Sequence, residues 1–325
     1  MTDDTSQSDD AAPLVSVVTP VYNAPEGIQT TLDCLVDQTL SPDQYEILVV
    51  DNNSTDDTAS VIKQYESEYE NVHYLFEDEY QSSYAARNRA ICEARAPLLA
   101  FIDADMSVDS DWLEMGIDAM DDDVSYMAFD VDLYSTGENE TLAEKYDRLT
   151  GFPIEQYVDE MNFGGAGCIF VRRAVFDDVG LFDPRFVSGG DFEFGNRVAD
   201  AGYEQQFTDT IVGRHEVRAT FQSQVKKDIR VGRGICQRQV YYPERFGKAG
   251  IPPLPSGIKS ADDDADSSAG ESSTASGSDT FELKEKMLFT LISAFLVLCR
   301  TYGYFNEYLF GDVYPRVPMT CEELD

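Results

Sequence analysis

The chain has 325 residues, of which 42% are hydrophobic and 12% aromatic, and its formal net charge at pH 7 is −37. This hydrophobic content can fill the core of one large or two small domains, and it excludes a disordered acidic chain. The negative charge excludes nucleic acid as a general partner, because phosphates would be repelled. Acidic residues lie along the whole chain, and such a surface is typical of a halophile working in high salt, such as a salt-in archaeon.

The cysteines and the first residues indicate the expected compartment. The six cysteines are widely spaced, with no CxxC pair. This spacing favours reduced core residues over zinc ligands or a disulfide framework. Residues 1–13 are polar and acidic, without the basic region and apolar run of a signal peptide, and they predict a disordered tail. We therefore expect a cytoplasmic protein.

Strands and helices alternate through the first part of the chain. Buried strands are expected where apolar, β-branched runs occur, at Leu14–Tyr22, Glu46–Asp51, Val72–Phe76, Leu98–Ile102 and Tyr126–Tyr134. Helices are expected at Pro25–Gln38, from within Ser54–Asp57 to about Tyr69, at Ser83–Ala94 and at Asp109–Met120. This alternation predicts βαβ units and an α/β fold with a mostly parallel sheet.

Polar residues directly follow three of these strands. Pro20–Asn23, Asp51–Ser54 and Asp103–Asp105 all lie at carboxyl ends, where ligands bind to such sheets, so we expect them to share one crevice. Asp103 and Asp105 can face the same side and bind a divalent cation such as Mg2+ or Mn2+. An Asp-x-Asp triplet also arises by chance in so acidic a chain. No GxGxxG or GxxxxGK[ST] motif occurs, which argues against dinucleotide and P-loop sites.

Further candidates lie in the second half. The glycines of Asn162–Arg172 predict a backbone close to a ligand. Asp191 is a candidate base or ligand, and a first-turn helix acid would explain it equally well. His215 is a candidate metal ligand. Basic residues concentrate within Arg214–Lys248, which favours a diphosphate, a phospholipid or a membrane surface as partner, although they could instead pair with acidic residues.

The C-terminal part changes in composition. Residues 251–280 are rich in Ser, Gly and Asp and predict a linker or surface insertion. Met287–Cys299 is apolar on all sides, but its length of about 20 Å falls short of the roughly 30 Å of a bilayer core. A helix buried against the preceding domain and one at a membrane interface explain it equally well. The expected division is a tail at 1–13, a domain at 14–250, a linker at 251–280 and a helical segment at 281–325.

Four motifs in a fixed order resemble those of family 2 glycosyltransferases with the GT-A fold. They are VSVVTPVYN; EILVVDNNSTDDT; AARNRA followed by LLAFIDAD; and SGGDFEFGNRV followed by RHEVR. The resemblance covers roughly residues 14–220. It implies a Rossmann-like GT-A domain with flanking helices and a helical C-terminal extension. It also implies inverting transfer of a sugar from a nucleotide-diphosphate donor, with UDP as the expected nucleotide.

The resemblance also implies a role for each matching residue. The nucleotide-sugar site would comprise Pro20, Tyr22, Asn23, Asp51, Arg87 and Asp103. Asp103 and Asp105 would bind the divalent metal, Mg2+ or Mn2+, and His215 would help to hold the metal or the diphosphate. Asp191 would be the catalytic base.

Two positions depart from the family pattern. Ala24 stands where the family usually has Glu, and Gly190 stands where a Glu usually precedes the base. The second departure leaves Glu193 as an alternative to Asp191. Trp112 is the only tryptophan, so the QxxRW motif of processive synthases cannot be present, and addition of a single sugar is expected.

The acceptor is inferred from the composition together with the resemblance. They imply a haloarchaeal enzyme, peripheral at the cytoplasmic face of the membrane, that adds a hexose or hexuronic acid to a dolichyl-phosphate-linked glycan. Such glycans serve protein N-glycosylation, including that of an S-layer. The alternatives are a glycosyltransferase for another cell-surface polysaccharide or glycolipid, a nucleotidyltransferase, and a non-catalytic membrane-associated scaffold.

Overall fold

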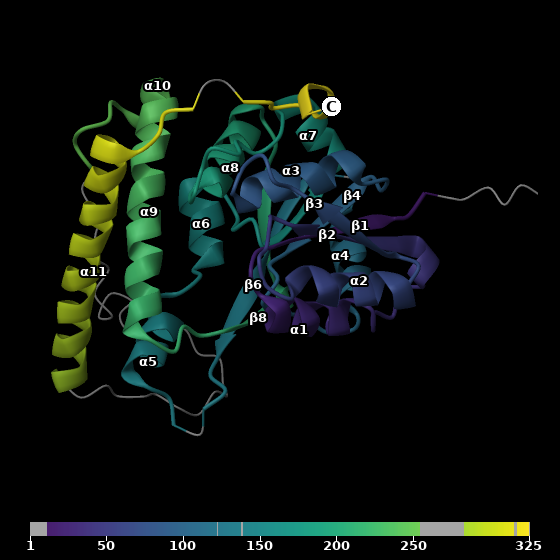
Figure 1. Ribbon diagram of the computed structural model, residues 1–325, viewed down its shortest axis with the longest axis horizontal. Coiled ribbons are helices and arrows are strands. Elements are labelled where there is room, and N and C mark those ends of the chain that lie inside the picture. The colour runs from purple at the N-terminus through teal and green to yellow at the C-terminus, as the bar shows by residue number, and fades with distance from the viewer. Residues whose placement is uncertain (1–11, 122, 138, 254–282, 315–316, 325) are drawn as a thin grey trace, which may run out of the picture. The chain divides into compact units, whose positions relative to one another are not determined.

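The computed structural model describes residues 12–121, 123–137, 139–253, 283–314 and 317–324 (Figure 1). Most of the predicted tail and of the predicted linker therefore lies outside the described residues. By their contacts the residues form two units, Met1–Ala219 with Val313–Asp325, and Thr220–Asp312. The second unit thus begins before residue 250, where the sequence placed the end of the first domain.

Eight strands of the first unit form one sheet in the order β3-β2-β1-β4-β7-β6-β8-β5. Their bounds are β1 Val15–Val21, β2 Tyr45–Asp51, β3 Val72–Phe76, β4 Leu98–Ile102, β5 Met106–Ser107, β6 Tyr126–Tyr134, β7 Cys168–Arg172 and β8 Gln205–Glu216. Pairs β1/β2, β1/β4, β2/β3 and β6/β8 are parallel, whereas β7 and β5 pair antiparallel with their neighbours. The predicted mostly parallel α/β sheet is confirmed.

Helices cover this sheet on both faces. They are α1 Pro25–Leu35, α2 Thr58–Glu68, α3 Ser83–Glu93, α4 Trp112–Ala119, α5 Leu142–Thr150, α6 Ile154–Met161, α7 Arg173–Val179, α8 Gly190–Asp200 and α12 Cys321–Leu324, with a 3-10 turn, η1, at Pro42–Gln44. Right-handed crossovers place α1 and α2 on one face. Because α3 leads back past β1 to β4, it lies on the opposite face, as Figure 1 shows.

The core lies along the central strands. Every residue of β1, β2 and β4 is buried, as expected for strands covered on both faces. Glu46 of β2 is among them. Its carboxylate accepts hydrogen bonds from Ser16 Oγ at 2.6 Å, the Arg95 backbone N–H at 2.7 Å and Arg95 Nε at 2.8 Å. Burial alone would raise the pKa of Glu46, but the hydrogen bonds from Ser16 and Arg95 and the charge of Arg95 outweigh it, and the pKa lies below its ordinary value.

This lowered pKa predicts acid sensitivity. The stabilisation by Glu46 is fully present above the unfolded-state pKa of about 4.3 and is lost as the pH falls through the folded-state value. We expect Glu46→Gln to make the free energy of unfolding fall less steeply than in the wild type below about pH 4.3. Chemical denaturation at several pH values in high salt measures this, with Glu26→Gln at an exposed position as control. Equal pH slopes for the wild type and Glu46→Gln would contradict the prediction.

A disulfide joins Cys92, near the end of α3, to Cys321 at the start of α12, with their Cα atoms 5.3 Å apart. The prediction of reduced cysteines is wrong for this pair. Because 229 residues separate the two, their spacing along the chain gave no signal. The free cysteines are Cys34, Cys168, Cys236 and Cys299. The bond ties the C-terminal residues to α3 and, by closing a long loop, stabilises the fold by about 2–4 kcal/mol.

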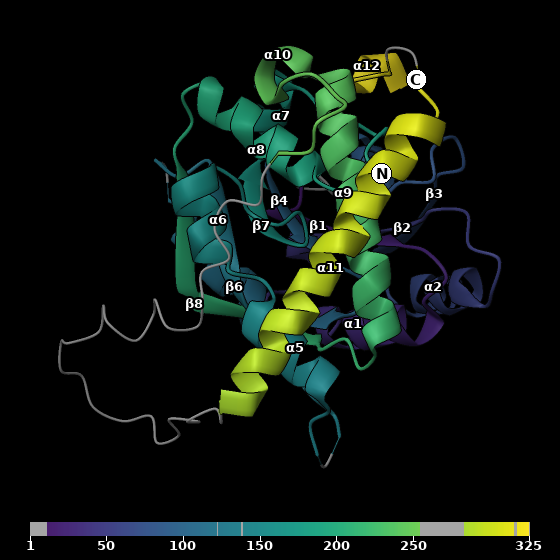
Figure 2. The same ribbon diagram turned by 90° about the vertical axis from the view of Figure 1, so that its left-hand side faces the viewer.

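The second unit consists of α9 Phe221–Tyr241, α10 Pro243–Phe246 and α11 Leu283–Phe310. Helices α9 and α11 run side by side in the same direction, as Figure 2 shows. Arg300 Nη2 lies 2.6 Å from Asp228 Oδ1, and further along Arg233 Nε lies 2.7 Å from Glu307 Oε2. A Cβ on Gly303 would meet the backbone of α9 at 2.1 Å, so this close approach requires glycine.

Helix α11 is longer than the apolar run that predicted it. Within it, Met287–Phe310 is long and apolar enough to cross a membrane, judged by length and composition alone. The apolar run Met287–Cys299 ends before Arg300, but the charge of Arg300 is paired with Asp228, and the helix continues beyond it through aromatic residues.

Candidate active site

The ends of β1 and β2 form one polar edge. Asp51 closes β2, and its Oδ1 accepts the Ser54 backbone N–H at 2.9 Å while Oδ2 accepts the Tyr74 hydroxyl at 3.2 Å. Asn23 has a left-handed backbone, with φ of 48°. Its Oδ1 accepts the Thr55 N–H at 2.8 Å, and its own N–H donates to Ser54 Oγ at 2.9 Å. The two predicted motifs are therefore hydrogen-bonded to each other.

Pro20 and Tyr22 differ in exposure. Pro20 is buried within β1, whereas Tyr22, one residue beyond the strand, is 50% exposed. Only the second therefore presents its side chain to a ligand. Helix α1 follows closely, and a Cβ on Gly27 would lie 2.7 Å from the Ala104 carbonyl oxygen. This contact sets the edge formed by β1 and β2 against the loop that carries the Asp-x-Asp triplet.

Asp103 is held by a buried arginine. Arg87 Nη2 lies 2.5 Å from Asp103 Oδ1, and the Arg87 side chain is only 4% exposed while that of Asp103 is 43% exposed. Arg87 Nε is buried and makes no hydrogen bond within the described residues. A Cβ on Gly167 would lie 2.4 Å from Asp103 Oδ2. The glycine-rich loop, which was predicted to lie close to a ligand, lies here against the Asp103 carboxylate.

Asp105 meets His215 because β5 pairs with β8, with Met106 opposite His215. Asp105 Oδ2 lies 3.3 Å from His215 Nε2, and the imidazole is largely buried while the carboxylate is exposed. Burial alone would lower the pKa of His215, but the hydrogen bond and charge of Asp105 raise it above its ordinary value. Burial opposes the shift at Asp105 as well, yet His215 lowers its pKa.

Arg218 adds positive charge at the same place. Its charge contributes to lowering the pKa of Asp105. Asp147 of α5, which is fully buried, accepts its backbone N–H at 2.8 Å and its Nη1 at 3.2 Å. Arg218 is the last residue of the RHEVR motif, and no role was predicted for it from the sequence. The basic segment was its only signal, because Asp147 lies 71 residues away.

Asp191 lies in the first turn of α8, after Gly189, whose φ is 79°. Its Oδ1 accepts the Tyr84 hydroxyl at 3.3 Å and the Phe192 backbone N–H at 2.9 Å. A Cβ at Gly190 would lie 2.9 Å from the Tyr84 ring. The glycine that replaces the usual Glu therefore makes room for Tyr84, which is the group that contacts the candidate base.

Glu193, the alternative base, has a different environment. It is fully buried, and its carboxylate pairs with Arg197 at 2.8 and 3.1 Å. Arg197 also donates to the Leu181 carbonyl at 2.7 Å and to the carbonyl of Val179. Glu193 is thus part of an ion pair that joins α8 to the end of α7, whereas Asp191 remains partly exposed.

Helix α3 connects the two carboxylates. Tyr84 and Arg87 lie one turn apart, and the Arg87 guanidinium carbon is 5.8 Å from the centre of the Tyr84 ring. Cys168, at the start of β7, lies within reach of the charges of both Asp103 and Asp191. Burial raises the pKa of its thiol, and the charges of both carboxylates raise it further.

The predicted residues therefore form three groups. The first group contains Asp103, Arg87 and Asp191, which are linked through Tyr84. The second contains Asp105 and His215. The third, at the edge formed by β1 and β2, contains the other predicted residues, Pro20, Tyr22, Asn23 and Asp51. Within the described part of the chain, no three His, Cys, Asp or Glu side chains cluster closely enough to hold a metal on their own.

The chain matches the family described as "Glycosyl transferase family 2" over residues 16–180. It is 39% identical over 236 residues to "Glycosyltransferase AglE" of Haloferax volcanii, covering 72% of this chain and 76% of that protein. It is 23% identical over 242 residues to a Methanococcus voltae protein, covering 70% and 75% respectively. That protein is named dolichyl N-acetyl-alpha-D-glucosaminyl phosphate 3-beta-D-2,3-diacetamido-2,3-dideoxy-beta-D-glucuronosyltransferase.

Solved structures share the fold. The mannosyltransferase PcManGT from Pyrobaculum calidifontis, in complex with GDP-Man and Mn2+, aligns with a TM-score of 0.56 at 17% identity, over 93% of this chain and 77% of that one. Residues 1–349 of S. aureus TarS, in complex with UDP-GlcNAc, align with a TM-score of 0.51 at 14% identity, over 71% and 74%.

Proposed function

The chain belongs to glycosyl transferase family 2, and we propose that it transfers a single hexose or hexuronic acid, with inversion, from a nucleotide-diphosphate sugar to a lipid-linked glycan. It is a glycosyltransferase, and the predicted GT-A fold is confirmed by its structural neighbours. Membership of this family excludes the two alternative functions, a nucleotidyltransferase and a non-catalytic scaffold. The observation that carries the proposal is the connection of Asp103 and Asp191 through one turn of α3.

We assign the nucleoside to the edge formed by β1 and β2. The exposed Tyr22 ring can pack against a base, and Asn23 and the buried Pro20 shape the end of β1. The Asp51 carboxylate is an acceptor, so it suits a base that presents an N–H group, as uracil does. Guanine also presents such groups, so the choice of a UDP-linked donor rests on the family resemblance and is tested below against GDP-sugars. Arg87, with its unsatisfied Nε, would lie near the nucleotide.

The donor set around Asp105 fits a divalent metal such as Mg2+ or Mn2+. A carboxylate oxygen and an imidazole nitrogen lie 3.3 Å apart at an exposed rim, and Asp103, which pairs with Arg87, carries a further carboxylate two residues before Asp105 along the chain. A small number of protein ligands is sufficient for a metal that also binds the phosphates of its substrate. When bound, the metal would stabilise the charge on the departing diphosphate. Arg218, oriented by Asp147, supplies positive charge at the same rim.

Asp191 is the proposed base. It would take the proton from the acceptor hydroxyl as that oxygen attacks the anomeric carbon from the face opposite the diphosphate, which inverts the centre. The Tyr84 hydroxyl donates to Asp191 and orients it. The ion pair of Glu193 with Arg197 supports this choice, because a paired and buried carboxylate is a poorer acceptor for a substrate proton.

One experiment tests the activity as a whole. Purified protein in high salt is supplied with a divalent metal and a panel of UDP- and GDP-sugars, and the release of nucleoside diphosphate is measured. Mass analysis of lipid-linked glycans from a deletion strain then identifies the missing sugar. A complete dolichyl-phosphate-linked glycan in that strain would refute the role in N-glycosylation, and release of pyrophosphate would refute the reaction type.

A lipid-linked acceptor is supported by the exposed face of α11 and by the acceptor in the Methanococcus voltae relative's name. Apolar side chains are exposed at intervals of three and four residues, at Leu288, Leu291, Phe295, Leu298, Tyr302, Phe305 and Leu309. Between Met287 and Phe310 only Arg300 and Glu307 are charged, and both pair with α9. In a chain this acidic, so wide an uncharged surface suits contact with lipid better than contact with α11 of a second copy of the chain. Helices that pair with each other usually carry charged residues beside their apolar contact, and this face has none.

We propose that α11 lies within the membrane interface and does not span the bilayer. Helix α9 runs alongside it and carries Asp228 and Arg233 at their contact. A spanning α11 would draw these charges into hydrocarbon, which is costly. An interfacial helix instead buries one apolar face. The location proposed for the enzyme is therefore peripheral to the membrane, and we propose the cytoplasmic face, as expected from the sequence.

A charge on this face should release the protein from lipid. We expect Leu298→Glu to weaken binding to phosphatidylglycerol vesicles at least tenfold in high salt, because a carboxylate must be dehydrated to enter the interface. Co-sedimentation measures the bound fraction. The control is Gln222→Glu, the same charge at an exposed position of α9. Absence of wild-type binding, or equal losses in both variants, would contradict the proposal.

A further inference from the structure

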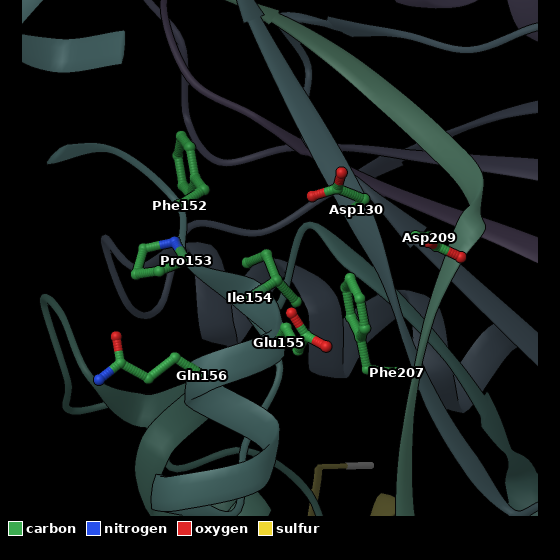
Figure 3. Close-up of a pocket in the computed structure, with 8 residues that line it drawn as sticks. All are labelled: Asp130, Phe152, Pro153, Ile154, Glu155, Gln156, Phe207 and Asp209. Carbon is green, nitrogen blue, oxygen red and sulfur yellow. The ribbon is translucent and has the colours of Figure 1, made fainter. Parts of the chain in front are cut away.

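A cavity of about 490 Å³ lies between β6, β8 and the start of α6 (Figure 3). Its lining residues are Asp130, Phe152, Pro153, Ile154, Glu155, Gln156, Phe207 and Asp209. None of them belongs to the groups assigned above. The volume is sufficient for a sugar ring, since ligand pockets in proteins begin at roughly 300 Å³.

The lining combines two kinds of group. The partly exposed Phe152 and Phe207 present apolar surface, with the buried Ile154 beside Phe152 in the chain, and Asp130, Glu155 and Asp209 present carboxylates. Sugar rings match this combination, because their hydroxyls donate to carboxylates while their C–H faces pack on aromatic rings. All eight lining residues are described by the structure, and none is cationic, so a phosphate or a uronic acid would meet like charges here.

The carboxylates do not form a cation site in the described structure, where no three acidic, histidine or cysteine side chains gather closely enough to hold a metal. Figure 3 shows Glu155 on the α6 side of the cavity, with Asp130 and Asp209 coming from the two strands. Carboxylates distributed in this way suit the separate hydroxyls of one ring better than a single ion.

The cavity borders the candidate active site in two places. The Phe152 ring centre lies 5.7 Å from that of His215, which contacts Asp105. Ile154 Cδ1 lies 3.7 Å from where a Cβ on Gly165 would be, in the loop whose Gly167 touches Asp103. A ligand in the cavity would therefore reach towards both sides of the site.

We propose that this cavity binds a neutral sugar residue of the acceptor glycan. The inference rests on the proposed glycosyl transfer and adds a selectivity to it. The acceptor sugar held here carries no carboxylate or phosphate, and the phosphate of the lipid carrier binds elsewhere. Hydroxyls of the sugar donate to Asp130, Glu155 or Asp209, and its apolar face packs on Phe207.

Saturation-transfer NMR on the full chain tests this assignment. The sample holds UDP and the diamagnetic Mg2+ in high salt, and the probes are methyl α-D-glucopyranoside, methyl α-D-mannopyranoside, glucuronate and glucose 6-phosphate. In the wild type, the neutral glycosides should receive saturation and the two anions should not. Phe207→Ala should weaken neutral glycoside binding about tenfold, because the ring contact is lost.

A charge reversal separates recognition from a merely structural effect. Asp209→Lys, at an exposed position, should gain glucuronate binding, whereas Asp177→Lys on α7 should leave the selectivity unchanged. Binding of anions by the wild type, no binding of either neutral glycoside, or unchanged selectivity in Asp209→Lys would each overturn the assignment. Hydrolysis of UDP-sugars by the wild type, measured in parallel, tests the proposed function separately, so the two failures are distinguishable.

Discussion

Replacing Asp191 by asparagine is expected to lower kcat for sugar transfer by about 10²- to 10⁴-fold, the usual contribution of a general base. The amide retains the shape and can still accept from Tyr84, but it cannot take a proton from the acceptor hydroxyl. Donor binding should persist, because Asp191 contacts α3 and the start of α8 and lies apart from the edge formed by β1 and β2. Turnover and donor affinity, measured separately, check both parts.

Glu193→Gln is the matched comparison, two residues further along the same helix. It breaks a buried ion pair with Arg197, so the free energy of unfolding should fall by about 3–5 kcal/mol. The folded fraction should keep its turnover. Full activity in Asp191→Asn, or a folded Glu193→Gln without turnover, would transfer the role of base to Glu193.

Asp105→Asn is expected to lower kcat/KM by about 10³-fold, because a metal contributes several kcal/mol of charge stabilisation to the transition state. The concentration of Mn2+ giving half-maximal activity should rise. The control is Asp109→Asn, which removes a nearby exposed carboxylate whose partner is Arg214 at 2.8 Å. A surface pair of this kind contributes little to stability. If Asp105→Asn kept the metal dependence of the wild type, the proposed metal site would be wrong.

Local pattern was enough to predict five of the eight strands, β1, β2, β3, β4 and β6, and the polar ends of three of them, whereas β5, β7 and β8 were not predicted. The observed bounds of β3, β4 and β6 coincide with those expected from apolar runs. A buried strand needs only a continuous run of suitable side chains, and that information lies within a few residues. The same is true of the Asp103–Asp105 triplet, whose position after β4 follows from chain order alone.

Pairings between distant residues could not be predicted in this way. Tyr84 meets Asp191 across 107 residues of sequence, and Asp228 neutralises Arg300 across 72. Each contact depends on how elements pack, which no local window contains. This is why Tyr84 received no role from the sequence, and why the apolar run was counted only as far as Arg300, whose charge is compensated in the structure.

Helix α3 has a consequence for how such an enzyme can diverge. This one rigid helix fixes the separation between Asp191, the proposed base, and Asp103, on the donor side, because Tyr84 and Arg87 contact them one turn apart. At its far end, Cys92 forms a disulfide with Cys321 near the C-terminus. The cavity at α6 and β8 is built from other elements. Substitutions there can change which sugar is accepted while the spacing of the reacting groups stays constant, so specificity and chemistry are free to evolve independently.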